Sequence, residues 1–276
     1  MSGMSPSGAG PEDREIPGIN LSVPHPARVY DYFLDGKDNF EADRIAAEAG
    51  IKAFPKTAES ARASRAFLRR VVRFLTAEAG IRQFLDIGTG LPSGENVHQV
   101  AQSLAPDARI VYADNDPIVL AHAHALLKGD PEGAVAYLDA DVRDPEKILA
   151  AAERTLDFTE PVGLLLLGIL HNVGDQYDPR GIVRQLVQAI PAGSYLAISH
   201  LTADIYPEVA DFAAALNERQ LDAPLVLRDH AQVSGFFEGL DLVEPGVVQI
   251  SKWRPQTELE SAAAAGLWGG VARKLA

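Results

Sequence analysis

The sequence FLDIGTG, residues 84–90, places an apolar run directly before two closely spaced glycines. Such a run is typical of a buried strand in a parallel sheet, and the glycines mark a tight turn into a helix. Gly88 and Gly90 lack a Cβ atom, so the backbone can approach a bound molecule closely. The N-terminus of the next helix offers free N–H groups to a carboxylate or phosphate. The alternative is a plain strand-to-helix turn that needs glycines for geometry alone.

Around this segment, short apolar runs alternate with helical patterns. Strands are predicted over residues 83–88, 109–114, 134–141, 161–170 and 193–201, and helices over residues 95–104, 117–127, 145–156, 181–190 and 206–219. This alternation predicts an α/β fold with a doubly wound, mostly parallel sheet covered by helices on both faces. Two later strands, residues 240–248 and 266–274, can add an antiparallel edge and give seven strands.

The chain before residue 80 has a different pattern. Residues 20–79 predict three helices, over residues 27–34, from the cap-like Asp38 to about 54 and over 57–79, and no strand. The first residues are rich in Ser, Gly and Pro, which is typical of disorder. We therefore expect a disordered tail (1–19), an N-terminal helical cap (20–79) and an α/β domain (80–276).

The composition argues against several classes of protein. The net charge of −13 repels nucleic acid, so no nucleic-acid partner is expected. The chain has no cysteine, and His98, His122 and His124 do not form a metal-binding pattern, so no metal site is predicted. The longest apolar run, residues 162–170, is too short to span a bilayer, and no signal pattern opens the chain. We expect a soluble, cytoplasmic protein.

Polar side chains follow the second and third predicted strands. Asp114, Asn115 and Asp116 end one strand, and Asp141 and Val142 end the other. At this edge Asp114 can accept hydrogen bonds from both ribose hydroxyls of an adenosine ligand, while Asp116 caps the next helix. Asp141 can accept a hydrogen bond from an adenine amino group, and the Val142 N–H can donate one to a ring nitrogen. Each acid could instead only cap a helix or lie in solvent.

Taken together, residues 86–90, 114–117 and 141–142 resemble the successive cofactor motifs of class I S-adenosylmethionine-dependent methyltransferases. The leader PARVYDYFLDGKDNF, residues 26–40, is similar to that of a poorly characterised S-adenosyl methyltransferase family of high-GC bacteria, as are FLDIGTGLP and Leu170-His171. The resemblance runs from about Pro24 to the C-terminus. It implies a Rossmann-like fold and S-adenosylmethionine as the cofactor, but not the identity of the methyl acceptor. The cofactor-binding residues it implies are Asp86, Gly88, Gly90, Asp114, Asn115, Asp141 and Val142.

One position departs from the broad superfamily, which commonly has a third glycine where this chain has Pro92. Proline removes an N–H donor, so the methionine carboxylate of the cofactor needs another partner. The leader can provide contacts, and Asn39 and Phe40, past the end of its helix, are the predicted ones. Arg65 lies in a basic stripe on the third helix and can hold the carboxylate with a bidentate fork. The alternative for Arg65 is a solvated face paired with acids.

Two histidines fall at the carboxyl edge of the predicted sheet, His171 after the fourth strand and His200 at the end of the fifth. An ordinary imidazole titrates near neutrality, so either can take a proton from an acceptor hydroxyl or amine. We expect His200 to line the cleft or bond to backbone, and we take His171 as the candidate base.

The sequence therefore predicts a methyltransferase whose acceptor, given the acidic charge, is a small molecule. Transfer from a sulfonium mainly requires alignment and exclusion of water, which fits the lack of a nucleophile–base triad. Two alternatives remain open. One is a protein that senses S-adenosylmethionine or S-adenosylhomocysteine without turnover. The other is an NAD-dependent oxidoreductase, in which Gly88, Gly90 and Gly94 form a loosened dinucleotide fingerprint.

Overall fold

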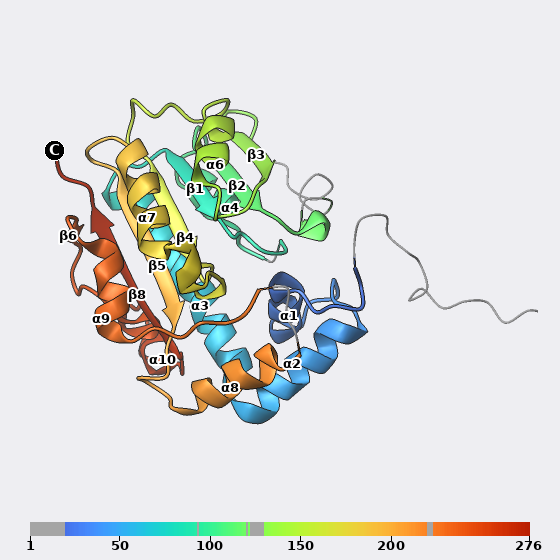
Figure 1. Cartoon of the computed structure of the whole chain (residues 1–276). Coiled ribbons are helices and arrows are strands. Elements are labelled where there is room, and N and C mark those ends of the chain that lie inside the picture. The colour runs from blue at the N-terminus through green and yellow to red at the C-terminus, as the bar shows by residue number, and fades with distance from the viewer. Residues whose placement is uncertain (1–19, 93, 120, 122–129, 220–222) are drawn as a thin grey trace, which may run out of the picture.

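The computed structural model describes residues 20–92, 94–119, 121, 130–219 and 223–276 (Figure 1). The predicted tail, residues 1–19, and most of the helix predicted over residues 117–127, with His122 and His124, lie outside these residues. In the part of the chain that is described, no helix combines the length and the apolar character needed to cross a membrane.

A mixed sheet forms the centre of the molecule, in the order β3-β2-β1-β4-β5-β8-β6, with β7 also paired to β8. The first five strands are parallel, and β8 runs antiparallel to β5. The strands are β1 Gln83–Ile87, β2 Arg109–Asp114, β3 Ala134–Asp139, β4 Gly163–Leu167, β5 Tyr195–Leu201, β6 Asp241–Leu242, β7 Val248–Gln249 and β8 Leu267–Arg273. The predicted fold is confirmed, except that the strand expected over residues 240–248 is split into two short strands. Pro245 and Gly246 lie between them, and proline cannot donate to a strand ladder.

Most helices lie close to their predicted positions, although the second begins at Glu41 rather than directly after Asp38, and the last two, which are short, were not predicted. The helices are α1 Pro26–Phe33, α2 Glu41–Ala53, α3 Thr57–Arg73, α4 Val97–Gln102, α6 Pro145–Ala152, α7 Pro179–Ala189, α8 Glu208–Asn217, α9 His230–Ser234 and α10 Glu258–Ala262. A π-helical turn, Phe74–Glu78, continues α3 to the predicted stop at Gly80, where φ is +73°. Glycine suits this left-handed conformation, because it has no Cβ atom to clash.

Each face of the sheet has its own apolar core. Successive strand residues point to opposite faces, so Leu85 and Leu164 join the core that contains side chains of α6 and α7. Phe84 and Leu165 join the other core, which contains side chains of α3 and α4. Burial on both faces explains why the central strands are apolar without alternation.

The cap is built from both halves of the chain. Side chains of α1 and α2 share a third apolar core with α8, from the C-terminal half, and α8 lies beside α2 (Figure 1). The Phe33 and Phe212 rings are 6.0 Å apart, and a Cβ atom at Gly50 would lie 2.8 Å from Phe212. The predicted cap, residues 20–79, therefore lacked one helix. It also included α3, which packs on the sheet.

Buried charges join the leader to the tip of β2. His25 Nδ1 lies 3.0 Å from Asp116 Oδ2, and Arg28 Nε lies 3.6 Å from both Asp116 Oδ2 and Asp43 Oδ1. Asp43 also accepts hydrogen bonds from the backbone N–H groups of His25 and Phe40, each at 2.9 Å. Asp116 accepts from the Ile118 N–H at 2.8 Å, the contact expected of a helix-capping side chain.

Replacing Asp43 by Ala should destabilise the protein strongly. The change leaves the Arg28 guanidinium buried without one of its two carboxylates, and breaking a buried pair costs about 3–5 kcal/mol. The free energy of unfolding from denaturant titration measures the loss. The matched control is Asp35→Ala, because Asp35 pairs with Arg62 on the surface, where such pairs contribute at most about 1 kcal/mol. Equal losses in the two variants would contradict a structural role for the buried cluster.

Candidate functional site

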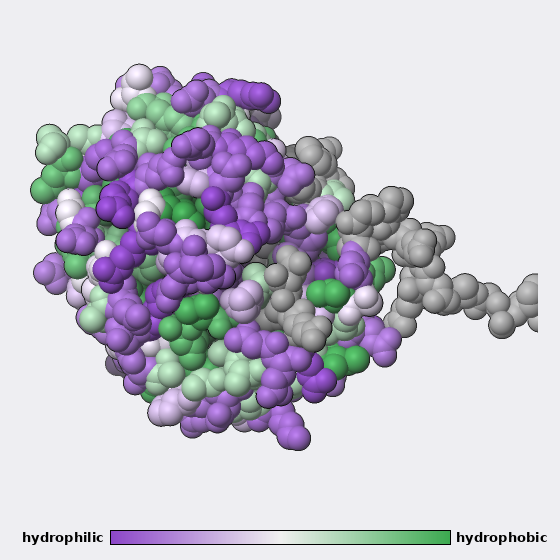
Figure 2. Space-filling model, in the orientation of Figure 1, coloured by the Kyte–Doolittle hydropathy of each residue, from purple (hydrophilic) through white to green (hydrophobic). Residues whose placement is uncertain are grey.

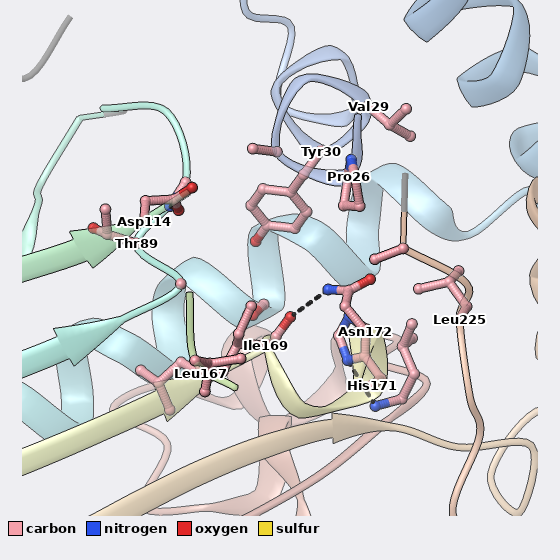
Figure 3. A pocket seen from close by; sticks show the side chains of 18 of the residues that line it. Pro26, Val29, Tyr30, Thr89, Asp114, Leu167, Ile169, His171, Asn172 and Leu225 are labelled. Atoms are coloured by element: carbon pink, nitrogen blue, oxygen red, sulfur yellow. Dashed lines mark hydrogen bonds between the residues drawn. The ribbon is translucent and has the colours of Figure 1, made fainter. Parts of the chain in front are cut away.

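A cavity opens at the carboxyl ends of the parallel strands, where the strand order reverses between β1 and β4. Ligands of open α/β sheets bind at this point. One end of the cavity is polar and is lined by Asp86, Thr89, Asp114, Asn115 and Asp141; the other is apolar and is lined by Val29, Phe33, Phe54, Val209, Phe212, Leu216 and Leu225. Figure 3 shows Thr89 and Asp114 on one side and Leu225 on the opposite side, with Tyr30 of α1 between them.

The glycine turn after β1 borders the polar end. Gly88 and Gly90 both have left-handed backbone conformations, with φ of +76° and +67°. A Cβ atom at Gly88 would lie 2.6 Å from Ile169, whereas one at Gly90 would meet nothing within 4 Å. Gly88 is therefore needed for packing within the protein. Gly90 instead leaves open space next to the strand tips.

Asp114 is held rigidly at the tip of β2. Its Oδ2 accepts a hydrogen bond from the Gly90 N–H at 2.8 Å, and its Oδ1 accepts one from the Asp116 N–H at 3.0 Å. Burial raises the pKa of Asp114, and these two backbone hydrogen bonds oppose the rise. Each carboxylate oxygen has further accepting capacity, so Asp114 can still accept hydrogen bonds from a ligand.

Asp141 and Val142 also lie on the cavity wall, as does Arg143, which the sequence did not single out. Arg143 Nε donates to Asp141 Oδ1 at 2.8 Å, and Asn115 Nδ2 donates to Asp141 Oδ2 at 3.2 Å. Burial raises the pKa of Asp141, but the hydrogen bonds from Arg143 outweigh it and the net shift is downward. Among the described residues the Val142 N–H has no hydrogen-bond partner.

Asp86 and Arg65 approach the glycine turn from two sides. Asp86, at 4% exposure, accepts a hydrogen bond from Thr89 Oγ1 at 3.1 Å. Burial raises the pKa of Asp86 to about 7, with Thr89 and Arg65 opposing the rise. Arg65 lines the cavity, and its Nη2 lies 3.2 Å from the Glu95 carbonyl oxygen.

The basic stripe on α3 therefore serves two purposes. Arg62 pairs with Asp35 at 2.9 Å and Arg69 pairs with Glu95 at 2.7 Å, as expected of a solvated face. Arg65, between them, faces the cavity instead.

The structure places Asn39 and Phe40 away from the cavity, contrary to their predicted contact with the cofactor. Asn39 is buried, and its Nδ2 donates to Asp31 Oδ2 at 2.8 Å and to the Gly36 carbonyl oxygen at 3.0 Å. Phe40 packs against the small apolar core that contains Leu91. The chain folds back on itself after α1, and both residues stabilise this fold of the leader through the contacts given above. Tyr30 and Val29, on α1 itself, line the cavity.

A buried arginine that the sequence did not reveal organises the region after β4. Arg228 Nη1 donates to the Leu170 carbonyl oxygen at 2.9 Å, and Nη2 donates to the Val173 carbonyl oxygen at 2.9 Å. Nη1 also lies 2.9 Å from His200 Nε2. Arg228 thus connects the 3₁₀ turn Leu170–Asn172 to β5. Along the chain it is more than 50 residues from the turn and 28 residues from His200.

These contacts determine the proton positions on both histidines. Arginine only donates, so His200 Nε2 accepts and His200 Nδ1 carries the proton, which it donates to the Leu201 carbonyl oxygen at 2.8 Å. The Leu201 N–H in turn donates to His171 Nδ1 at 3.5 Å, which leaves the proton of a neutral His171 on Nε2. Burial lowers the pKa of His200 to about 4 and that of His171 well below its ordinary value.

His200 therefore bonds to backbone as predicted, whereas the geometry argues against His171 as a general base. A neutral imidazole with the proton on Nε2 and Nδ1 already engaged has no lone pair to offer to an incoming proton. His171 lines the cavity as a hydrogen-bond donor instead. The sequence predicted the position of His171 but not its protonation, because its pKa is lowered by burial and by the neighbouring His200 and Arg228.

The family model described as S-adenosyl methyltransferase matches residues 12–275. The chain belongs to this S-adenosyl methyltransferase family. A crystal structure of a DUF574 family protein from Streptomyces avermitilis is 46% identical, has a TM-score of 0.88, and covers 92% of this chain and 98% of its own. A second crystal structure, of a protein from Thermobifida fusca, is 43% identical and has a TM-score of 0.86. The match covers 94% of this chain and 98% of that protein's chain. None of the curated proteins matches.

Family membership confirms the resemblance seen in the sequence. The protein is an S-adenosylmethionine-dependent methyltransferase, and S-adenosylmethionine is its cofactor. The alternative of an NAD-dependent oxidoreductase is overturned by the family match.

The tautomers of the two histidines can be measured directly. Nitrogen-15 correlation spectra of the imidazole rings at about pH 6 should show both rings neutral, His200 with the proton on Nδ1 and His171 with it on Nε2. In an unfolded chain histidine titrates near pH 6.5, so the unfolded state binds more protons as pH falls from about 6.5 to 4, and the free energy of unfolding should fall over this interval. A protonated His171 at pH 6 would contradict the arrangement.

Proposed function

We propose that the protein transfers the methyl group of S-adenosylmethionine to a small, largely apolar molecule held between the strand tips and the cap. This proposal rests on the different lining of the two ends of the cavity. Acidic side chains lie at the strand tips, and aromatic and aliphatic side chains lie under α1 and α8. Pockets for small molecules are typically apolar with a few placed polar groups. The net charge of −13 also disfavours a nucleic-acid acceptor. The face of the molecule seen in Figure 2 is mostly hydrophilic, with smaller hydrophobic areas between the polar ones.

The polar end has groups that suit each part of the cofactor. Asp114 would accept from the ribose hydroxyls, since both oxygens keep accepting capacity. Asp141 and the unpartnered Val142 N–H match the donor and acceptor on the edge of an adenine ring. Asn115 lies beside them and holds Asp141. The open space at Gly90 allows a ligand to lie against the backbone.

Arg65 and Asp86 would bind the amino-acid half. Arg65 faces the glycine turn from α3 and can bind a carboxylate, which compensates for the donor lost at Pro92. Asp86, buried close by, would favour a cationic amino group.

The cofactor, when bound, supplies a methyl group on a positively charged sulfur. On transfer, a lone pair of the acceptor would form the new bond to the methyl carbon, the electron pair of the broken S–CH₃ bond would stay on sulfur, and the acceptor would release a proton if it carried one. The chain's own residues align the acceptor and exclude water. Because His171 is fixed as a donor, the site suits an acceptor that does not require deprotonation by this residue.

A labelling experiment tests the proposed acceptor class. The protein is incubated with S-adenosylmethionine labelled in the methyl group and with a cell extract divided into small-molecule and macromolecular fractions. Label should appear in the small-molecule fraction. Label transferred only to protein or nucleic acid would refute the proposal, and tight binding of the cofactor with no transfer in any fraction would favour a sensor.

Replacing Arg65 by Ala should weaken the binding of S-adenosylhomocysteine by about 10- to 100-fold, because a hydrogen bond to a charged group contributes about 1.5–3 kcal/mol. Titration calorimetry measures the change. Arg62→Ala is the matched control, since Arg62 is on the same helix but pairs with Asp35 on the surface. Equal effects in the two variants would mean that the stripe acts only through its total charge.

The affinity for S-adenosylhomocysteine should fall as pH decreases below about 7. In the free protein Asp86 has a pKa of about 7, and a cationic amino group bound beside it would lower that pKa. Binding then expels a proton at low pH, and the affinity decreases by up to about tenfold per pH unit. Calorimetry in two buffers of different ionisation enthalpy measures both effects. Asp86→Asn should bind more weakly and show a smaller slope; an affinity that rises toward low pH would contradict the assignment.

A further inference from the structure

Asn172 lies where the polar and the apolar end of the cavity meet. The turn Leu170–Asn172 follows β4, and both His171 and Asn172 line the cavity. Figure 3 shows Asn172 between the strand tips, marked by Thr89 and Asp114, and the apolar end, marked by Leu225. An acceptor that lies at the apolar end next to the cofactor would therefore be close to this turn.

Asn172 has an acceptor atom without a partner. Its Oδ1 is buried and accepts no hydrogen bond from the described residues. Its Nδ2 donates to the Gly168 carbonyl oxygen at 3.5 Å. This contact sets the orientation of the amide, because the flipped amide would place two oxygens against each other. In Figure 3 the oxygen lies on the side of Leu225.

A buried oxygen without a hydrogen-bond partner is costly, and the packing of the described residues offers no explanation for it. Leaving such an acceptor unsatisfied costs about 1–3 kcal/mol, and buried polar groups in native proteins are nearly always paired. The apolar side chains at this end, Phe33, Phe212 and Leu225, offer no donor. A group on a bound molecule can fill the role, since the terminal torsion of Asn is broad and a small rotation turns Oδ1 toward the cavity.

The neighbouring His171 offers the complementary group. Its Nε2 carries a proton, because Nδ1 accepts from the Leu201 N–H. The turn therefore places one acceptor and one donor side by side next to the mainly apolar end of the cavity. Arg228 holds the turn in place through the Leu170 and Val173 carbonyl groups, so this pair is preorganised.

We infer that Asn172 determines acceptor specificity: its Oδ1 accepts a hydrogen bond from an N–H or O–H group of a small, mostly apolar acceptor. The inference rests on the proposed function, because it places the acceptor at the apolar end of the same cavity. An acceptor that presents a carboxylate to this oxygen is rejected, since two acceptors repel each other. A shape-matched molecule without a donor leaves Oδ1 unpaired and binds less tightly.

Two probes of nearly the same shape test this directly. Indole carries one N–H donor, and benzofuran has a ring oxygen at the same place. Their binding is measured by ligand-observed NMR titration of the full chain saturated with S-adenosylhomocysteine. The wild type should bind indole about tenfold more tightly than benzofuran, the effect of one ordinary hydrogen bond.

Two variants show whether Asn172 causes the preference. Asn172→Leu removes the acceptor and should abolish the preference for indole, whereas Asn172→Gln keeps an amide oxygen and should retain part of it. The denaturation midpoint is a second readout. Asn172→Leu should leave it unchanged or raise it, because an unsatisfied polar atom is lost, whereas a purely structural Asn172 would make the variant less stable.

Several results would overturn the inference. They are equal binding of the two probes by the wild type, an unchanged preference in Asn172→Leu, and binding of neither probe to a chain that does bind S-adenosylhomocysteine. Failure of S-adenosylhomocysteine itself to bind would instead refute the proposed cofactor site. The two failures are therefore distinguishable.

Discussion

Two buried carboxylates at the tip of β2 hold together the segments that enclose the cavity. Asp114 accepts hydrogen bonds from Gly90 and so joins the glycine turn after β1 to the neighbouring strand. Asp116 begins the next helix and faces His25 and Arg28 of the leader. Because these groups are buried, their partners must be in place for the charges to be tolerated. The cap, the turn and the strand tip therefore form one unit, and the polar end of the cavity is rigid.

The apolar end depends on a different contact, between segments far apart in the chain. The α8 helix packs on α1 and α2, and Phe33 and Phe212 meet between them. This packing creates a lobe beside the strand tips that the α/β domain alone would not enclose. The two ends therefore have different roles. The strand tips provide polar groups for the cofactor, and the packed helices provide an apolar environment that excludes water from the acceptor.

The region after β4 shows how protonation follows from tertiary contacts. Arg228 donates to His200, which in turn donates to the Leu201 carbonyl oxygen, and the Leu201 N–H donates to His171. Each histidine is thereby limited to one tautomer, and burial keeps both neutral. A histidine at the carboxyl edge of a sheet has the position of a general base, but here its proton is on the nitrogen that would have to accept. With Asn172 it forms a donor–acceptor pair instead.

The amino-acid sequence was enough to predict the sheet, the order of its elements, the glycine turn and the acids at the strand tips. These features are local: strands buried on both faces are apolar throughout, turns require glycine where φ is positive, and parallel strands bring their carboxyl ends to one edge. Only the folded chain reveals that α8 completes the cap, that Asn39 supports the leader, and that the Leu201 N–H sets the tautomer of His171. Each of these depends on contacts across long stretches of chain, and neither residue type nor spacing encodes which distant group fills a given space or carries a given proton.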